Sequence, residues 1–392
     1  MNYDRYLNPE IAAVPPSGIR RFFDLASTMK NTISLGVGEP DFITPYHIRN
    51  AAINSIVDGE TQYTPNRGLL PLRKEIAAYL AGRYQTEYNP DTEILVTVGA
   101  SESIDAALRA IVSRGDEVLV PEPSYVSYSP SVIFAGGTPV GVQTRAETDF
   151  RLTPEAVEKA ITPRTKALIL PYPNNPTGAI MEKDDLEAIA RVIREKQILV
   201  ISDEIYSELT YGDRHHVSFA SLPGMHELTL TINGFSKAFA MTGWRVGYIC
   251  GPAPLIEVMN KIHQYSILCA PRQGQAAALE ALRTGRENGY DDVVRMRESY
   301  DRRRRLMVDG FRSMGLDCFE PLGAFYVFPS IKSTGLDSET FCERLLREHS
   351  VACVPGTAFG ACGEGHIRCS YATALDKLNT ALERMQAFLS SL

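Results

Sequence analysis

The sequence lacks any long apolar run. No stretch approaches the roughly 18–20 consecutive apolar residues that a membrane-spanning helix requires. The first 30 residues are polar and include Pro15, Pro16 and several charges, so they also lack the apolar centre of a secretory signal. We therefore expect a cytoplasmic protein that has no membrane partner.

Cysteine is sparse, and positive charge is not in excess. The seven cysteines include no Cys-x-x-Cys pair, and Cys353, Cys362, His366 and Cys369 do not match the spacings of common metal sites. We expect reduced thiols and no bound metal. The formal net charge of −7 argues against a nucleic-acid partner, because phosphate backbones attract basic surfaces.

The one basic cluster, Arg302–Arg305, lies in a segment with helical periodicity. Between Val293 and Met314 the apolar residues recur at spacings of three, four or seven, which predicts a helix over about 288–314 with one buried stripe. We expect the four arginines to lie largely on the solvated side of this helix, rather than to bind phosphates.

Short apolar runs alternate with helix-length segments from about residue 50 to residue 285. The runs are rich in Val, Ile and Leu without polar alternation, which is typical of strands buried on both faces. This pattern predicts an α/β fold with a mostly parallel, seven-stranded sheet covered by helices. The predicted strands are 94–98, 117–120, 138–143, 166–170, 198–202, 228–232 and 245–250, with helices at 101–113, 153–161 and 183–196.

The pattern changes after the helix of about 288–314. Strand-like segments at 323–331, 351–355 and 366–372 alternate with helices at 337–348 and 374–390, which predicts a smaller α+β domain. We expect three parts along the chain. Residues 1–45 form an N-terminal segment that packs on the small domain, 46–285 form the large domain, and 286–392 form the small one.

Two polar residues lie shortly after predicted strands. Asp203 comes after the strand 198–202, at the sheet edge where open α/β sheets bind ligands, although such an acid often only caps the next helix. Lys237 follows the strand 228–232 among small and apolar neighbours. Because burial of an ammonium is costly, such a lysine has a lowered pKa and can attack a carbonyl. The alternative is a surface lysine in a loop.

Two turns could also contribute to a site. Asn175 lies in the turn Pro173–Gly178 and could donate its amide to an oxygen in a cleft, or the segment could be only a tight turn. The segment Gly99–Ser103 joins a strand to a helix, where free backbone N–H groups form an anion site.

These segments, in this order, resemble the class I/II aminotransferases of the pyridoxal-5′-phosphate (PLP) fold-type I superfamily. The resemblance runs from Gly36–Phe42 through Tyr63–Gly68 to His366–Ser370. It implies that the cofactor is PLP and that Lys237 attaches the cofactor and acts as the catalytic base.

The resemblance implies further roles around the cofactor ring. Asp203 would pair with the ring nitrogen, and Asn175 and Tyr206 would donate to the ring oxygen. Tyr125 would stack on the ring face.

For the phosphate group, the resemblance implies a clamp formed by Arg245 and three backbone N–H groups. Ser236 is a further candidate, because Gly234 stands where many relatives carry a hydroxyl residue. Tyr63 would reach the phosphate from the neighbouring subunit, which implies a homodimer with shared active sites. The three N–H groups belong to Ala100, Ser101 and Glu102.

For the substrate, the resemblance implies that Arg368 binds the α-carboxylate, with help from the Gly38 backbone and Asn175. The alternative for Arg368 is an ordinary salt-bridged arginine on a strand. Arg20 and Arg21 are candidates for a second carboxylate contact by location only.

The expected reaction moves an amino group between an L-amino acid and a 2-oxo acid, with glutamate and 2-oxoglutarate as one pair. Several segments look closest to the aminotransferase A group, whose members are assigned to N-acetyl-L,L-diaminopimelate, while aspartate, alanine and aromatic amino acids remain open. A C–S lyase that works by β-elimination shares the same contacts. An aminotransferase-like regulator is disfavoured, because few residues precede Gly36 and the charge is acidic.

Overall fold

The computed structural model describes residues 3–16, 18, 29 and 31–392. Arg20 and Arg21 lie outside these residues. Among the helices of the described part, none is both long enough and apolar enough to cross a membrane.

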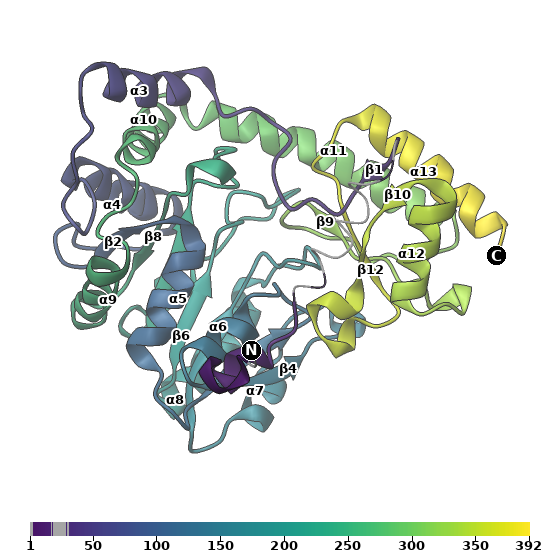
Figure 1. Ribbon diagram of the computed structural model, residues 1–392, viewed down its shortest axis with the longest axis horizontal. Helices are drawn as coiled ribbons and strands as arrows, with labels where there is room; N and C mark the ends of the chain where they lie inside the picture. The colour runs from purple at the N-terminus through teal and green to yellow at the C-terminus, as the bar shows by residue number, and fades with distance from the viewer. Residues whose placement is uncertain (1–2, 17, 19–28, 30) are drawn as a thin grey trace.

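A seven-stranded sheet forms the centre of the larger lobe (Figure 1). All of its neighbouring strands pair in parallel except at β8, which is antiparallel to both β2 and β7. The structure therefore confirms the predicted α/β fold with a mostly parallel sheet. In spatial order the strands are β2 (Ile94–Thr97), β8 (Gly247–Cys250), β7 (Thr229–Gly234), β6 (Leu199–Asp203), β5 (Thr165–Leu170), β3 (Glu117–Glu122) and β4 (Thr138–Gln143).

Both faces of this sheet are buried, because alternate residues of a strand point to opposite faces and a hydrophobic core covers each face. On β5, Ala167 and Ile169 pack in the core that contains α5 and α9, whereas Leu168 and Leu170 pack in the core that contains α7 and α8. This explains the uninterrupted apolar runs in the sequence. The helices of this lobe are α3 (Tyr46–Val57), α4 (Leu70–Tyr84), α5 (Gly99–Ile111), α6 (Tyr128–Phe134), α7 (Pro154–Ala160), α8 (Lys183–Lys196), α9 (Ala253–Ser266) and α10 (Arg272–Asn288).

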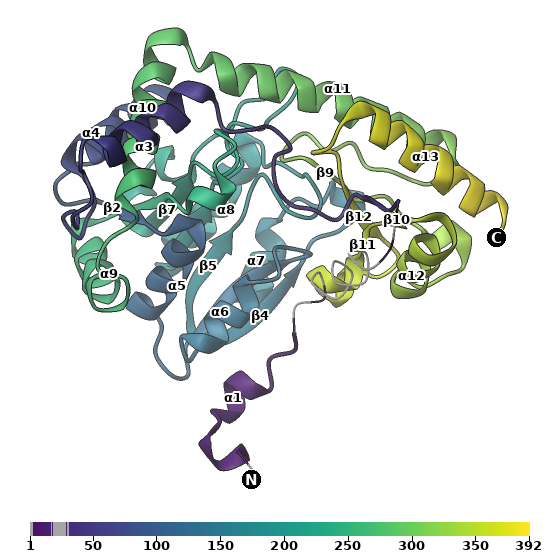
Figure 2. The ribbon, with the colours of Figure 1, turned by 45° about the horizontal axis from the view of Figure 1, so that its top comes forward.

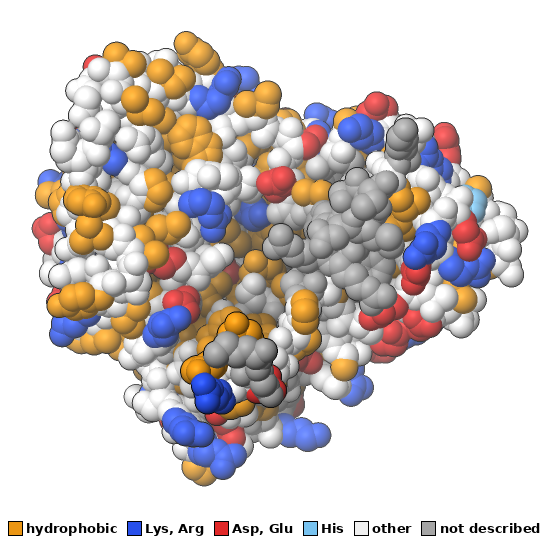
Figure 3. All heavy atoms as spheres, viewed as in Figure 1, with side chains coloured by type: hydrophobic (Ala, Val, Ile, Leu, Met, Phe, Trp, Pro, Cys, Tyr) orange, Lys and Arg blue, Asp and Glu red, His pale blue; other side chains and the backbone are white. Residues whose placement is uncertain are grey.

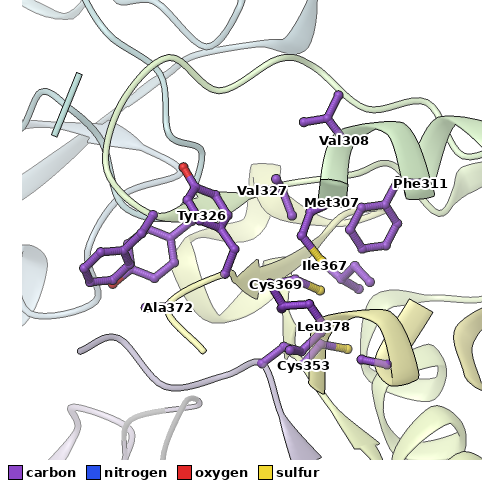
Figure 4. Packing of buried hydrophobic residues seen from close by; sticks show 14 of the residues in the cluster. Met307, Val308, Phe311, Tyr326, Val327, Cys353, Ile367, Cys369, Ala372 and Leu378 are labelled. Atoms are coloured by element: carbon purple, nitrogen blue, oxygen red, sulfur yellow. The ribbon is translucent and has the colours of Figure 1, made fainter. Parts of the chain in front are cut away.

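The C-terminal part forms a second lobe beside the sheet (Figures 1 and 2). Its antiparallel sheet has the order β11-β12-β9 and is covered by α11, α12 and α13. Figure 4 shows the core of this lobe, where Phe311, Ile367 and Leu378 lie close together. The elements are α11 (Asp291–Ser313), β9 (Tyr326–Val327), α12 (Ser338–His349), β10 (Val351–Ala352), β11 (Val354–Pro355), β12 (Ile367–Ser370) and α13 (Leu375–Ser390).

The single strand predicted at 351–355 was wrong, because two short strands occupy that stretch. β10 pairs in parallel with β1 (Ile33–Ser34), while β11 pairs with β12, and Cys353 separates them. The N-terminal segment thus contributes a strand beside the small lobe. Further upstream, its first α-helix, α1 (Pro9–Ala12), lies against α6 of the larger lobe.

The prediction for the arginine cluster was wrong for two of its four residues. Arg303 and Arg304 are buried, whereas Arg302 and Arg305 are exposed. Arg303 pairs with Asp41 at 2.7 Å, and Arg304 pairs with Glu320 at the same distance. Arg304 also pairs with Asp301 one turn earlier on the same helix, a contact that helical spacing allows. Asp41 and Glu320 lie outside the helix, so helical periodicity alone could not reveal that they compensate the two guanidinium groups.

Candidate active site

A cleft of about 1230 Å³ opens between the carboxyl ends of the central strands and the C-terminal lobe. It gathers the predicted site residues with the exception of Glu102 and Tyr63. Val14, Pro15, Pro16 and Gly18 of the N-terminal segment also line it. The predicted residues in its lining are Gly38, Ala100, Ser101, Tyr125, Asn175, Asp203, Tyr206, Ser236, Lys237, Arg245 and Arg368.

Asp203 ends β6 and is buried in the floor of the cleft. Its Oδ2 accepts a hydrogen bond from the Tyr128 hydroxyl at 2.8 Å, and its Oδ1 accepts one from the Ile205 N–H at 3.2 Å. Burial raises the pKa of this carboxyl to about 6, against the lowering effect of these hydrogen bonds. A cationic group placed beside it would keep it ionised.

Tyr128 is a site residue that the sequence reasoning missed. It begins α6, three residues after Tyr125, and the two rings pack edge to face with centroids 5.6 Å apart. Its spacing from Tyr125 was visible in the sequence, but the direction of its hydroxyl depends on how α6 packs on the sheet beside β3 and β4.

Lys237 follows β7, the strand next to β6. Its Nζ donates a hydrogen bond to the carbonyl oxygen of Gly38 at 2.6 Å. The pKa of this amine is lowered to about 8, chiefly by burial and also by the nearby Arg368 and Arg245, while Glu39 acts in the opposite direction. A substantial fraction of the amine is therefore neutral near pH 8 and able to act as a nucleophile or base.

The turn between β2 and α5 lies beside Arg245. Gly99 has a φ of +74°, and a Cβ added there would lie 2.6 Å from Nη2 of Arg245, so only glycine fits this close approach. Ala100 and Ser101 follow in the first turn of α5, where N–H groups lack helical partners. Together the arginine and the free N–H groups form a site suited to an anion such as phosphate.

Arg368 lies on β12 and is almost wholly buried. Its Nη1 donates to Oδ1 of Asn175 at 2.9 Å, and its Nη2 donates to the carbonyl oxygen of Gly36. The guanidinium lies over the rings of Tyr326 and Phe359, 4.6 and 4.8 Å from their centroids. Within the described residues no carboxylate pairs with it, so the alternative of a salt-bridged structural arginine is not supported. A buried cation without a countercharge is suited to an anionic ligand.

Tyr206 shares a hydrogen bond of 2.8 Å with the hydroxyl of Tyr326. Burial raises the pKa of Tyr206 well above its ordinary value, so the phenol stays protonated and can donate. Tyr326 was not among the predicted residues. It lies in the apolar segment Gly323–Pro329, where the sequence did not distinguish it from core residues. Its hydroxyl reaches the cleft because β9 places it against Gly38.

Two predicted residues do not line the cleft of this chain. Tyr63 lies in the segment that follows α3, and it is 80% exposed. The side chain of Glu102 points toward α9, where its Oε1 lies 2.6 Å from Nδ1 of His263. Ser236 is buried at the cleft wall, as a phosphate contact would require.

Comparison with known proteins identifies the family. The family model described as "Aminotransferase class I and II" matches residues 30–385. The chain belongs to the class I and II aminotransferases. An aspartate aminotransferase of Pyrococcus abyssi is 48% identical over 98% of both chains. A Bacillus subtilis protein named "Probable N-acetyl-LL-diaminopimelate aminotransferase" is 44% identical, over 98% of this chain and 96% of the relative. The solved structure of an aromatic aminotransferase from Pyrococcus horikoshii superposes with a TM-score of 0.90 at 48% identity, covering 94% of this chain and 99% of the other.

Membership confirms the resemblance inferred from the motifs and shows that this aminotransferase is an enzyme that transfers amino groups. The relatives are named for different amino acids, so membership does not choose the substrate.

Proposed function

We propose that this aminotransferase binds PLP in the cleft and moves an amino group between an L-amino acid and a 2-oxo acid. The observation that carries the proposal is the placement of Lys237 and Asp203 at or near the ends of adjacent strands, together with Arg368, which has no carboxylate partner among the described residues. When bound, the cofactor supplies an electron-withdrawing ring that weakens bonds at the substrate Cα.

The donor set of the cleft fits this cofactor. The buried carboxylate of Asp203 would pair with the ring nitrogen, and Tyr128 and the Ile205 N–H hold that carboxylate in place. Asn175 and Tyr206 would donate hydrogen bonds to the ring oxygen, and Tyr125 would stack on the face of the ring. The lowered pKa of Lys237 suits both covalent attachment and proton transfer at the substrate Cα.

The anion site beside α5 fits the phosphate group. Arg245 and the N–H groups of Ala100, Ser101 and Glu102 would hold it, with Ser236 as a further contact. This assignment is supported by the close approach of Gly99 to Arg245.

Arg368 would bind the α-carboxylate of the substrate through parallel N–H bonds. The carbonyl groups of Gly36 and Asn175 already orient its guanidinium from one side, and the Gly38 backbone lies nearby in the cleft wall. Asn175 therefore supports both the cofactor and the substrate arginine. Arg368 lies in the proposed small domain, 286–392, whereas Lys237 lies in the proposed large domain, 46–285.

We propose a homodimer with shared active sites. Hydrophobic side chains gather on the larger lobe over α3 and α9 (Figure 3), and they include Tyr46, Val57 and Tyr265, which are 71%, 77% and 87% exposed. Tyr63, exposed on the same lobe, would extend to the phosphate of the partner subunit. Burial of this apolar surface is the expected driving force for association.

A panel of amino donors tests the reaction and the substrate together. The panel contains aspartate, alanine, aromatic amino acids and N-acetyl-L,L-diaminopimelate, each with 2-oxoglutarate as the acceptor, and glutamate formation is measured. Glutamate that depends on both donor and acceptor supports the proposal. Release of ammonia and a 2-oxo acid from a sulfur amino acid without any acceptor would instead identify the C–S lyase.

A further inference from the structure

The side chain of Glu102 closes the turn that carries the proposed phosphate site. Glu102 lies in the first turn of α5, and its Oε2 accepts a hydrogen bond from the backbone N–H of Val98, the residue before that helix. The bond joins the two ends of the turn Val98–Glu102. Ala100 and Ser101, which lie between these ends in the first turn of α5, line the cleft, and N–H groups in a first turn have no helical partner.

The second oxygen of Glu102 is held by a buried histidine on another helix. Oε1 lies 2.6 Å from Nδ1 of His263, on α9, which packs against α5. The His263 side chain is 0% exposed, and that of Glu102 is 13% exposed. Because a carboxylate only accepts hydrogen bonds, Nδ1 carries the proton and donates to it.

This contact is the single polar contact that the His263 side chain makes within the described part of the chain. Its Nε2 is buried and has no hydrogen-bond partner there. A buried polar ring with one unpaired nitrogen costs free energy, and an apolar side chain in the same space would avoid that cost. The hydrogen bond to Glu102 is therefore the interaction that distinguishes a histidine from an apolar side chain at this position.

The turn has little freedom to move once Glu102 is fixed. A Cβ added to Gly247 on β8 would lie 2.7 Å from the backbone nitrogen of Ala100, and one added to Gly99 would lie 2.6 Å from Arg245. The backbone of residues 99–100 is thus enclosed by β8 on one side and the arginine on the other. A small displacement of the turn therefore changes the distance between its N–H groups and an anion bound by Arg245.

We propose that His263 is a positioning residue for the phosphate site. Its Nδ1–H holds the Glu102 carboxylate, the carboxylate closes the turn, and the turn directs its N–H groups at the phosphate beside Arg245. The inference rests on the proposed function, because it takes the turn to be the phosphate site. It predicts a specific defect: without His263 the phosphate group is held less well, while the ring contacts at Asp203 are unchanged.

The test compares two ligands that differ only in the phosphate. The cofactor is removed from the full-length protein, and the dissociation constants of PLP and of pyridoxal, which lacks the phosphate, are measured by absorbance titration. We expect His263→Leu to weaken PLP binding about ten- to a hundredfold, the effect of losing one hydrogen bond to a charged group. Pyridoxal binding should stay within about twofold, because pyridoxal does not use the turn.

Two further variants keep the test informative. His263→Asn places an amide N–H near the position of Nδ1 and should recover most of the PLP affinity, which mere filling of the space would not do. Glu102→Ala removes the same link from the other side while keeping the backbone N–H, and should reproduce the selective loss if His263→Leu does not fold. Lys261→Ala, at an exposed position of α9, is the matched control and should bind both ligands as wild type does.

The outcomes separate the inference from the function it rests on. Arg245→Ala should weaken PLP but not pyridoxal if the phosphate lies beside the turn. Equal losses of both ligands in His263→Leu, or no loss in either His263→Leu or Glu102→Ala, would overturn the role of His263 while leaving the site intact. If Arg245→Ala also fails to distinguish the two ligands, the phosphate site itself has been placed wrongly.

Discussion

At the scale of single residues, the cleft is assembled from groups that are costly to bury. Asp203, Lys237 and Arg368 all face the same cavity, and each has its pKa shifted by burial against its charged form. Such groups reduce the stability of the folded chain unless a ligand of opposite charge compensates them. This cost leads to two predictions that can be tested without any substrate.

The first prediction concerns Asp203 in the cofactor-free protein. The folded-state pKa of about 6 lies above the ordinary value of 3.8, so the folded chain binds this proton more tightly and loses stability as pH rises from about 4 to 6. Asp203→Asn removes that cost and should stabilise the cofactor-free protein at pH 8 by about 1–2 kcal/mol. Urea unfolding measures the difference, which should shrink toward pH 4. A variant that is less stable than wild type at pH 8 contradicts the prediction.

The second prediction concerns the reactivity of Lys237. Burial lowers the pKa of its amine to about 8, whereas exposed lysines titrate near 10.4. An amine-selective reagent should therefore modify Lys237 of the cofactor-free protein with a midpoint near pH 8. Peptide mapping by mass spectrometry at a series of pH values reports each lysine separately, and the exposed Lys261 serves as the internal control. A midpoint for Lys237 equal to that of the exposed lysines is the contrary result.

At the scale of elements, the sequence predicted the buried strands best. The apolar runs at 166–170 and 198–202 correspond to β5 and β6 within about one residue, because burial on both faces leaves no polar interruption. The division of 351–355 into β10 and β11 was not predicted, since it depends on β1 and β12 as partners. Lys237 and Asp203 could be found because each lies at or shortly after the end of an apolar strand. Tyr128, Tyr326 and His263 could not, because their hydrogen bonds join elements that only packing brings together.

The third prediction concerns the pair that joins α11 to the segment before α3. Arg303 is buried, donates to Asp41 at 2.7 Å, and lies over the rings of Phe42 and Tyr300. Asp41→Ala leaves this guanidinium buried without its countercharge, so we expect a loss of about 2–4 kcal/mol in the free energy of unfolding. Denaturant unfolding of the cofactor-free chain measures it. Arg302→Ala, at the exposed neighbouring position, should change stability by less than about 0.5 kcal/mol, and similar losses in both variants would show that the pair has no special role.

At the scale of the whole molecule, the fourth prediction concerns the shared active site. Tyr63 is exposed and does not line the cleft of its own chain, as a residue that serves the partner subunit would be placed. Tyr63→Ala and Lys237→Ala should each be nearly inactive. Refolding the two variants together should restore about a quarter of the sites, because random pairing makes half of the dimers mixed and each mixed dimer has one intact site. No recovery in mixed dimers verified by native mass spectrometry would exclude the shared site.

The fifth prediction concerns how Arg368 connects the two lobes. Arg368 lies on β12 of the C-terminal lobe, whereas Asp203 ends β6 and Lys237 follows β7 of the central sheet. A substrate held by its α-carboxylate at Arg368 and reacting at Lys237 therefore bridges the two lobes, and its binding energy can draw them together and exclude water. Asn175, which follows β5 of the central sheet, already bonds to Arg368 across the same boundary.

Arg368→Lys keeps the charge but loses the two parallel N–H bonds. We expect kcat/KM for an amino acid to fall by a factor that corresponds to roughly 2–4 kcal/mol, the range for truncating one partner of a buried charge pair. An amine of similar size without a carboxylate gains nothing from the arginine, so its slower reaction should be nearly unchanged. The amine without a carboxylate is the control, because it reports any effect of the substitution that does not depend on the carboxylate. Equal losses for both would mean that Arg368 supports the packing of Tyr326 and Phe359 and does not select the carboxylate, because a packing defect displaces every substrate alike.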